Sequence, residues 1–208
     1  MTKLIPQTLL LEIYMKTILI AVPTAKYIEP ETFKSIFDLI IPEGYKVSFE
    51  FTTGNDVDQV RNLIASCGVK FDYLFAVDSD ISFPQDTLQR LLDDDKDIVS
   101  GLYIQRIPGT HHLELYKNGR LVYSDIKDLG LFEIDSCGFG CVLIKSEVLR
   151  NIKYPYFVYK SAINHEETLS EDTYFCIKAR EAGFSVWADT KILCSHHGNT
   201  VFEIKNEI

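Results

Sequence analysis

The chain has 208 residues, of which 46% are hydrophobic and 25% are charged. This size and composition are typical of one globular domain with its own core, so we expect a single domain over residues 1–208. The formal net charge of -9 at pH 7 disfavours a nucleic acid or an anionic membrane as the main partner, because both attract basic surfaces. A phosphate-containing ligand would therefore need a cation to help bind it.

The cysteines and the N-terminal segment indicate where the protein works. The five cysteines are scattered and form no CxxC pair, which argues against a disulfide framework or a zinc site and predicts a reducing, cytoplasmic location. Residues 4–14 are apolar, but Glu12 and Lys16 interrupt the run well short of the ~20 residues of a membrane span. We expect no transmembrane segment and interpret residues 1–14 as an appendage; a signal peptide is the alternative.

Up to residue 101, short apolar runs alternate with longer amphipathic ones, a pattern typical of parallel strands linked by crossover helices. The predicted strands are residues 17–22, 46–51, 73–77 and 97–100, and the predicted helices are residues 30–40, 56–66 and 84–93. Pro30 and Pro84 would occupy first helical positions, where proline is favoured.

The second half of the chain has a mixed character. Asn118 and Gly119 separate two apolar runs and predict a type I′ hairpin between residues 113–116 and 121–123. The remaining elements expected are strands at 131–134, 140–144, 184–187 and 192–194, an irregular stretch at 154–170, and a helix at 171–182 ending before Gly183. The predicted fold class is α/β, with a mostly parallel central sheet flanked by helices and a smaller mixed or antiparallel part in the second half.

Asp78 and Asp80 directly follow residues 73–77, the most apolar predicted strand. Ligands gather at the carboxyl ends of strands in open α/β sheets, so this position favours function. Two carboxylates one residue apart can turn toward one hard cation, Mn²⁺ or Mg²⁺, which also binds phosphate oxygens. An acidic turn that caps the next helix is the alternative. The acidic run at residues 93–95 follows a helix and is interpreted as a solvated turn.

Two later motifs could reach the same site. Ser170, Glu171 and Asp172 stand at a predicted helix start, and His196 and His197 follow the last strand. A serine before two acids is also a good helix N-cap, and a histidine pair beside glycine is also a polar turn. Imidazole, however, commonly joins carboxylates around Mn²⁺. Spacing alone does not decide between these readings.

Taken together, four segments resemble glycosyltransferases of the GT-A fold. They are residues 73–81, 137–144, 170–184 and 194–198, in the order found in that family. The similarity spans residues 16–200 and is closest to small family-2-like enzymes of bacteria, phages and large DNA viruses, so a virus-encoded protein in a host cytoplasm is compatible with it. It implies a nucleotide-binding half at residues 1–101 and an acceptor-side half at 102–208.

The resemblance also assigns roles to individual residues. It implies a divalent cation, Mn²⁺ or Mg²⁺, held by Asp78, Asp80 and His196, with Asp80 the more direct ligand. It implies Asp172 as the general base, with Glu171 as the fallback. The donor contacts that it implies are Pro23, Thr24, Arg61, Asn62, Asp78, Ser79, Asp80, Gly138 and Phe139. For Arg61 a solvent-facing position on its helix is the alternative.

The predicted function is transfer of a sugar from a nucleotide-diphosphate donor, a UDP-sugar by family frequency, to a hydroxyl of a saccharide or glycan acceptor, with inversion. Because sugars stack on aromatic faces, the predicted acceptor contacts are His111, His112, Tyr154, Tyr156 and Phe157, with core packing the favoured role for each aromatic taken singly. The alternatives are a haloacid-dehalogenase-like phosphatase that uses Asp78 and Asp80, and an inactive nucleotide-sugar-binding module. The chain also fits a domain cut from a longer multidomain protein.

Overall fold

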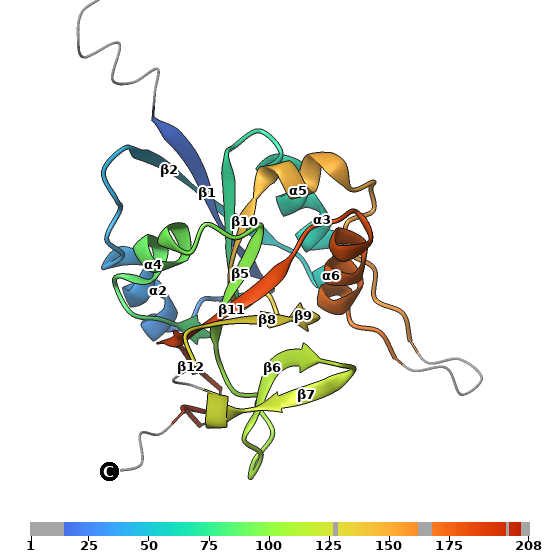
Figure 1. Ribbon diagram of the computed structural model, residues 1–208. Coiled ribbons are helices and arrows are strands. Elements are labelled where there is room, and N and C mark those ends of the chain that lie inside the picture. Colours follow the sequence, from blue (N-terminus) through green and yellow to red (C-terminus); the bar gives the residue numbers. More distant parts are fainter. Residues whose placement is uncertain (1–14, 127–128, 162–167, 199, 205–208) are drawn as a thin grey trace, which may run out of the picture.

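The computed structural model of the protein describes residues 15–126, 129–161, 168–198 and 200–204 (Figure 1). The appendage expected at residues 1–14 lies outside this range. Within it, the sheet that forms the centre of the molecule has seven strands in the order β2-β1-β3-β10-β5-β11-β8. Their bounds are β1 Lys16–Thr24, β2 Tyr45–Thr53, β3 Tyr73–Val77, β5 Ile98–Leu102, β8 Leu131–Ile134, β10 Cys141–Lys145 and β11 Val186–Leu193.

The sheet is mostly parallel, which confirms the predicted fold class. Strands β2, β1 and β3 pair in parallel, as do β5 and β11, whereas β10 runs antiparallel between β3 and β5, and β8 is antiparallel to β11. Because β10 reverses direction between them, β3 and β5 point the same way. The carboxyl ends of β1, β3, β5 and β11 therefore meet at one edge of the sheet, where ligand sites of open α/β folds form.

Helices cover both faces of the sheet (Figure 1). They are α2 Pro30–Phe37, α3 Val57–Gly68, α4 Thr87–Asp93, α5 Ser146–Asn151 and α6 Glu171–Glu181. Side chains alternate along β1, so Leu19 and Ala21 pack in the core with α3, α5 and α6, while Ile18 and Ile20 pack with α2 and α4. None of the helices in the described part of the chain is both long and apolar enough to cross a membrane.

The largest differences from the predicted helix bounds are at the end of α2 and at the start of α4. Helix α2 ends at Phe37, before the predicted residue 40, because Ile40 donates its N–H to the Gln85 carbonyl, over 2.9 Å, outside the helix. Helix α4 begins at Thr87, not at Pro84. The Pro84 carbonyl instead accepts a hydrogen bond of 3.1 Å from the Thr87 N–H, in a turn that precedes the helix. At α2 a contact between distant residues takes a backbone group that the local pattern assigned to the helix, whereas at α4 a local turn between residues three apart precedes the helix.

Two small sheets complete the fold. Strands β6 His112–Lys117, β7 Arg120–Tyr123 and β9 Ser136–Cys137 form one, and β4 Ile81–Ser82 pairs with β12 Ser195–His196 in the other. Between β6 and β7, Asn118 has φ 52° and Gly119 has φ 71°, which confirms the predicted type I′ hairpin. A short 3₁₀ helix follows at Ser124–Ile126. The two separate strands predicted at 184–187 and 192–194 are replaced by one continuous strand, β11 Val186–Leu193, whose register shifts between Ala188 and Leu193.

Candidate functional site

The segment Asp78–Asp80 leaves the sheet at the end of β3, all of whose residues are buried. Its backbone is fixed to two distant segments: Asp78 N–H donates to the Gly140 carbonyl over 3.1 Å, and Asp80 accepts from His197 N–H over 2.8 Å. The pairing of β4 with β12 then sets His196 opposite Ile81. Three of the segments singled out in the sequence are therefore joined by main-chain hydrogen bonds.

Asp80 and His196 face each other, with 3.7 Å between Asp80 Oδ2 and His196 Nε2. The other ring nitrogen, Nδ1, lies 2.9 Å from the Ile104 carbonyl, which only accepts, so Nδ1–H donates to it and Nε2 is the nitrogen that faces Asp80. Burial alone would raise the pKa of Asp80, but the contact with His196 and the charge of Arg106 outweigh it, and this pKa is lowered.

Asp78 turns away from that pair. Its Oδ1 accepts a hydrogen bond of 2.8 Å from Arg61 Nη2. As a result, the three predicted metal ligands Asp78, Asp80 and His196 do not converge on one point. Among the residues that the structure describes, no group of three or more His, Cys, Asp and Glu side chains is arranged to hold a metal ion.

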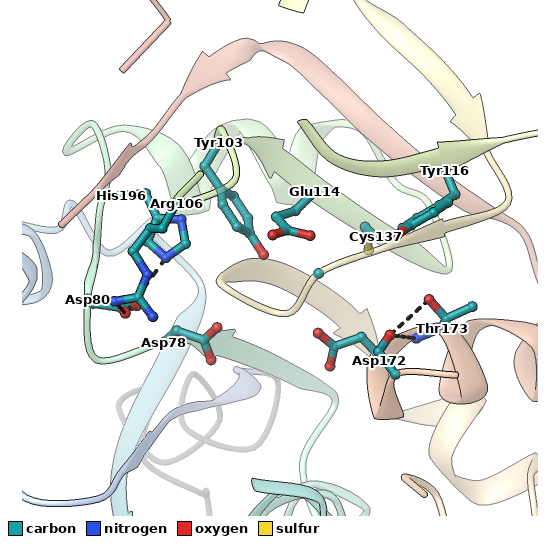
Figure 2. A pocket seen from close by; sticks show the side chains of 12 residues that line it. Asp78, Asp80, Tyr103, Arg106, Glu114, Tyr116, Cys137, Asp172, Thr173 and His196 are labelled. Carbon is teal, nitrogen blue, oxygen red and sulfur yellow. Dashed lines mark hydrogen bonds and ion pairs between the residues drawn. The ribbon is translucent and has the colours of Figure 1, made fainter. Parts of the chain in front are cut away.

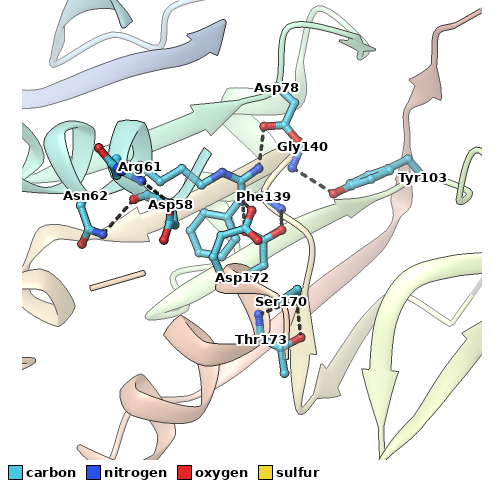
Figure 3. Close-up of polar contacts among 12 residues, drawn as sticks. Asp58, Arg61, Asn62, Asp78, Tyr103, Phe139, Gly140, Ser170, Asp172 and Thr173 are labelled. Atoms are coloured by element: carbon cyan, nitrogen blue, oxygen red, sulfur yellow. Dashed lines mark hydrogen bonds and ion pairs between the residues drawn. The ribbon is translucent and has the colours of Figure 1, made fainter. Parts of the chain in front are cut away.

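Arg61 lies at the centre of a buried charge cluster (Figure 3). Its side chain is only 7% exposed and, besides Asp78, forms ion pairs with Asp172 and, at 3.5 Å, with Glu171. Its guanidinium carbon is 5.4 Å from the centre of the Phe139 ring. The alternative of a solvent-facing helix arginine is therefore wrong: Arg61 connects α3 to the start of α6 and to the end of β3.

Asp172 and Glu171 differ in what they face. Asp172 Oδ2 accepts from the Phe139 N–H over 3.3 Å, and Asp172 lines a pocket of about 250 Å³ at this edge. Glu171 is buried and does not line that pocket. Ser170 Oγ caps the helix by accepting from Thr173 N–H over 3.3 Å, which fixes the first turn of α6 and the direction of Asp172.

Two adjoining pockets share Asp78 and Asp80. The first pocket, of about 250 Å³, is lined by the predicted site residues Asp78, Asp80, Gly138, Asp172 and His196. Figure 2 shows the carboxylates of Asp78 and Asp172 pointing toward each other across this pocket. The second, of about 200 Å³, contains the predicted donor contacts Pro23, Thr24, Arg61, Asp78, Ser79 and Asp80. Residues from the ends of β1 and β3 and from α3 thus lie beside residues from α6 and β12.

Asn62 lines neither pocket, although the resemblance assigned it to the donor. Its side-chain oxygen accepts from Tyr156 N–H at 2.7 Å and Phe157 N–H at 3.1 Å, and its amide nitrogen donates to the Phe157 carbonyl at 2.7 Å. The amide is therefore occupied by backbone groups of the irregular stretch after α5. We correct its expected role from donor contact to support of that stretch.

The aromatic residues assigned to ligands also lie elsewhere. Phe139 and Phe157 are each 2% exposed and pack with Phe175 in the core, with ring centres 4.8 to 5.1 Å apart. Neither ring lines the two pockets, so at Phe139 only the backbone N–H, bonded to Asp172, belongs to the site. The other predicted acceptor contacts, His111, His112, Tyr154 and Tyr156, are also outside both pockets.

The pocket residues that the sequence analysis missed include Tyr103, Arg106 and Glu114. Tyr103 accepts the Gly140 N–H at 3.0 Å, and burial, with the charges of Asp78 and Glu114, raises its pKa. Burial also raises the pKa of Glu114, against the opposing contact with Gln105 at 3.4 Å. The position of Tyr103 and Arg106 just after β5 was the available signal, since β5 ends at the same sheet edge.

Solved structures with the same arrangement include glycosyltransferases. A197 from STIV matches with a TM-score of 0.59 and 19% identity, over 93% of this chain and 96% of that chain. GalNAc-T7, solved with UDP, GalNAc and Mn²⁺, matches with a TM-score of 0.57 and 9% identity, over 88% of this chain and 44% of that chain. The catalytic domain of Drosophila β1,4-galactosyltransferase 7, solved with xylobiose, matches with a TM-score of 0.53 and 14% identity, over 92% of this chain and 72% of that chain.

The chain has a GT-A-like fold. No family model and no curated protein matches it, and these structural likenesses are all below 20% identity. The comparisons therefore establish the GT-A-like fold.

Proposed function

We propose that this protein is a glycosyltransferase that uses a divalent cation, Mn²⁺ or Mg²⁺, to transfer a sugar from a UDP-sugar to a hydroxyl of a saccharide or glycan, with inversion. The observation that carries the proposal is the pocket of about 250 Å³ in which Asp80, His196 and Asp172 meet. It adjoins the second pocket, which would take the nucleotide. GalNAc-T7, which shares the fold, was solved with UDP and Mn²⁺.

The residues present fit a cation between Asp80 and His196. Carboxylate oxygen and imidazole nitrogen are suitable ligands for Mn²⁺. The hydrogen bond from His196 Nδ1–H to the Ile104 carbonyl, 2.9 Å long, is the outer contact that orients metal-binding histidines and leaves Nε2 free to coordinate. When bound, the cation would neutralise charge on the leaving diphosphate. We assign direct binding to Asp80 and His196, and place Asp78 beside them as the partner of Arg61.

The donor would extend from the second pocket into the first, past Ser79. Pro23 and Thr24 would contact the nucleotide, in the half formed by residues 1–101. Gly138 would lie under the sugar, because a Cβ at this position would collide with the Tyr103 hydroxyl and fill the space. Residues 102–208 would supply the acceptor side.

Asp172 is the proposed general base that takes the proton of the acceptor hydroxyl. It is the carboxylate at the start of α6 that lines the pocket, and its Oδ2 is oriented by the Phe139 N–H at 3.3 Å. A base must reach the hydroxyl directly, so an oriented carboxylate at the pocket wall meets the geometric requirement. Glu171, which faces Arg61, would act on this step only through that charge.

A thermal-shift experiment tests the proposal. UDP and a panel of nucleotide sugars are added with and without Mn²⁺, and we expect a rise in melting temperature that requires both, because ligands that bind only the native state stabilise it. Asp80→Asn should abolish the rise, and Asp93→Asn, at an exposed position at the end of α4, should keep it. If no nucleotide gives a Mn²⁺-dependent shift, the proposal is wrong.

Product analysis separates this function from the two alternatives. A transferase releases UDP from a UDP-sugar, whereas a phosphatase with Asp78 as nucleophile would release inorganic phosphate from a phosphomonoester. An inactive binding module would show the Mn²⁺-dependent shift with no UDP release toward any acceptor or water. The anomeric configuration of the product distinguishes inversion from retention.

A further inference from the structure

Arg106 occupies the position next to the proposed cation site (Figure 2). It follows β5, and its Nη1 lies 2.8 Å from Asp80 Oδ2 and 3.3 Å from the His197 carbonyl. Asp80 Oδ2 is also the oxygen that faces His196 Nε2 at 3.7 Å. One carboxylate oxygen thus has the guanidinium of Arg106 and the Nε2 atom of His196 as its neighbours.

A divalent cation and this guanidinium would compete for the same oxygen. A cation bound to Asp80 and His196 sits roughly 2.0–2.2 Å from its ligand atoms, which puts it against Arg106 in its present place. Two positive groups at such a distance repel each other strongly. Arg106 must therefore move from Asp80 when the cation binds, and its side chain, 49% exposed, has the freedom to do so.

In the same position, Arg106 also lines a further pocket of about 210 Å³, together with Lys26, Glu29 and Ser79. This pocket adjoins the proposed donor pocket through Ser79 and Asp80. A diphosphate that passes Ser79 would come within reach of both basic side chains. Guanidinium groups bind phosphate oxygens in a bidentate way, so the diphosphate is a better partner for Arg106 than a cation-bound Asp80.

We propose that Arg106 is a counter-ion with two positions: it neutralises Asp80 when the site is free of cation, and it moves to the donor diphosphate when cation and nucleotide bind. This inference rests on the proposed function. It makes cation binding without nucleotide weak, because the cation must displace Arg106 with no phosphate to receive it. It also makes cation and nucleotide bind cooperatively.

The test measures Mn²⁺ and UDP separately in the wild type, Arg106→Gln and a matched control, Arg120→Gln, at an exposed position in the β6–β7 hairpin. Free Mn²⁺ is counted by electron paramagnetic resonance without nucleotide, and UDP affinity is measured by calorimetry at saturating Mn²⁺. We expect Arg106→Gln to bind Mn²⁺ about threefold to tenfold more tightly, and UDP about tenfold more weakly, than the wild type. Arg120→Gln should match the wild type in both.

The two-position model predicts opposite changes in the two affinities for Arg106→Gln. If Arg106→Gln binds Mn²⁺ no more tightly than the wild type, or keeps wild-type affinity for UDP, the inference is wrong even though the proposed function stands. Asp80→Asn, which should lose Mn²⁺ binding, reports on the proposed function itself. If neither the wild type nor Arg106→Gln binds Mn²⁺, both the function and this inference fail.

Discussion

Arg61 Nη2 donates a hydrogen bond of 2.8 Å to Asp78 Oδ1, and this buried ion pair joins helix α3 to the motif that follows β3. The same guanidinium faces Glu171 and Asp172 at the start of α6. One arginine thus reduces the repulsion among three carboxylates in a poorly solvated place. It holds both sides of the proposed site at a fixed separation before a ligand arrives.

Replacing Arg61 by methionine should destabilise the protein by about 3–5 kcal/mol, because it leaves carboxylates buried without their counter-ion. Urea unfolding measures the change. Arg90→Met is the matched control, since Arg90 is 44% exposed and pairs with Asp86 at 2.7 Å within one helix turn. That surface pair should contribute less than about 1 kcal/mol. Equal losses in the two variants would contradict a central role for Arg61.

Asp172→Asn should reduce sugar transfer by about 10²–10⁴-fold, the usual contribution of a general base, and should leave UDP affinity at saturating Mn²⁺ unchanged. Glu171→Gln should lower transfer by less than about tenfold, because Glu171 lies outside the pocket and acts through Arg61. UDP release from the donor gives the rate, and calorimetry gives the affinity. Near-normal turnover in a folded Asp172→Asn protein would rule out Asp172 as the base.

The sequence predicted the sheet well because its strands carry a strong local signal. Residues 73–77 are an unbroken apolar run and are buried on both faces, as a central strand must be. The order of the strands was not predictable in the same way. Strand β10 inserts antiparallel between β3 and β5, and this depends on packing between residues more than 40 positions apart, which no local pattern encodes.

Site residues could be predicted from the sequence only where they directly follow the end of a strand. Asp80 and His196 follow strands that end at one edge, so their proximity could be anticipated. Glu114 could not, because it alternates with the buried Leu113 and Leu115 and therefore has the pattern of a solvent-facing residue. Its side chain instead faces the pocket, and only the assembled fold places the polar side of β6 there.

Asn62→Asp should destabilise the protein by about 2–4 kcal/mol. The carboxylate could still accept from Tyr156 and Phe157 N–H, but it could not donate to the Phe157 or Asp58 carbonyl, at 2.7 and 2.8 Å in the present structure. Two acceptors would lose their donor and face a buried negative charge. Urea unfolding checks the loss, with Asn151→Asp, at an exposed position near the end of α5, as control. A loss below that of the control would refute the supporting role.

Asp94→Asn should stabilise the protein at neutral pH and have little effect in acid. Burial, followed by the charge of Asp189, raises the Asp94 pKa from 3.8 to about 6, and no donor in the described residues reaches its buried Oδ2. Because the folded-state pKa lies above the unfolded value, the carboxylate reduces stability as pH rises from about 4 to about 6, and the cost stays constant above that range. Melting temperatures at about pH 4 and about pH 7.5 measure the difference.

Asp95→Asn is the control, for which we expect a change of opposite sign. A hydrogen bond from Lys145 lowers the Asp95 pKa, so removing this carboxylate should reduce stability at neutral pH. A stabilisation by Asp94→Asn that is equally large at both pH values would show that burial of the charge is not its cause.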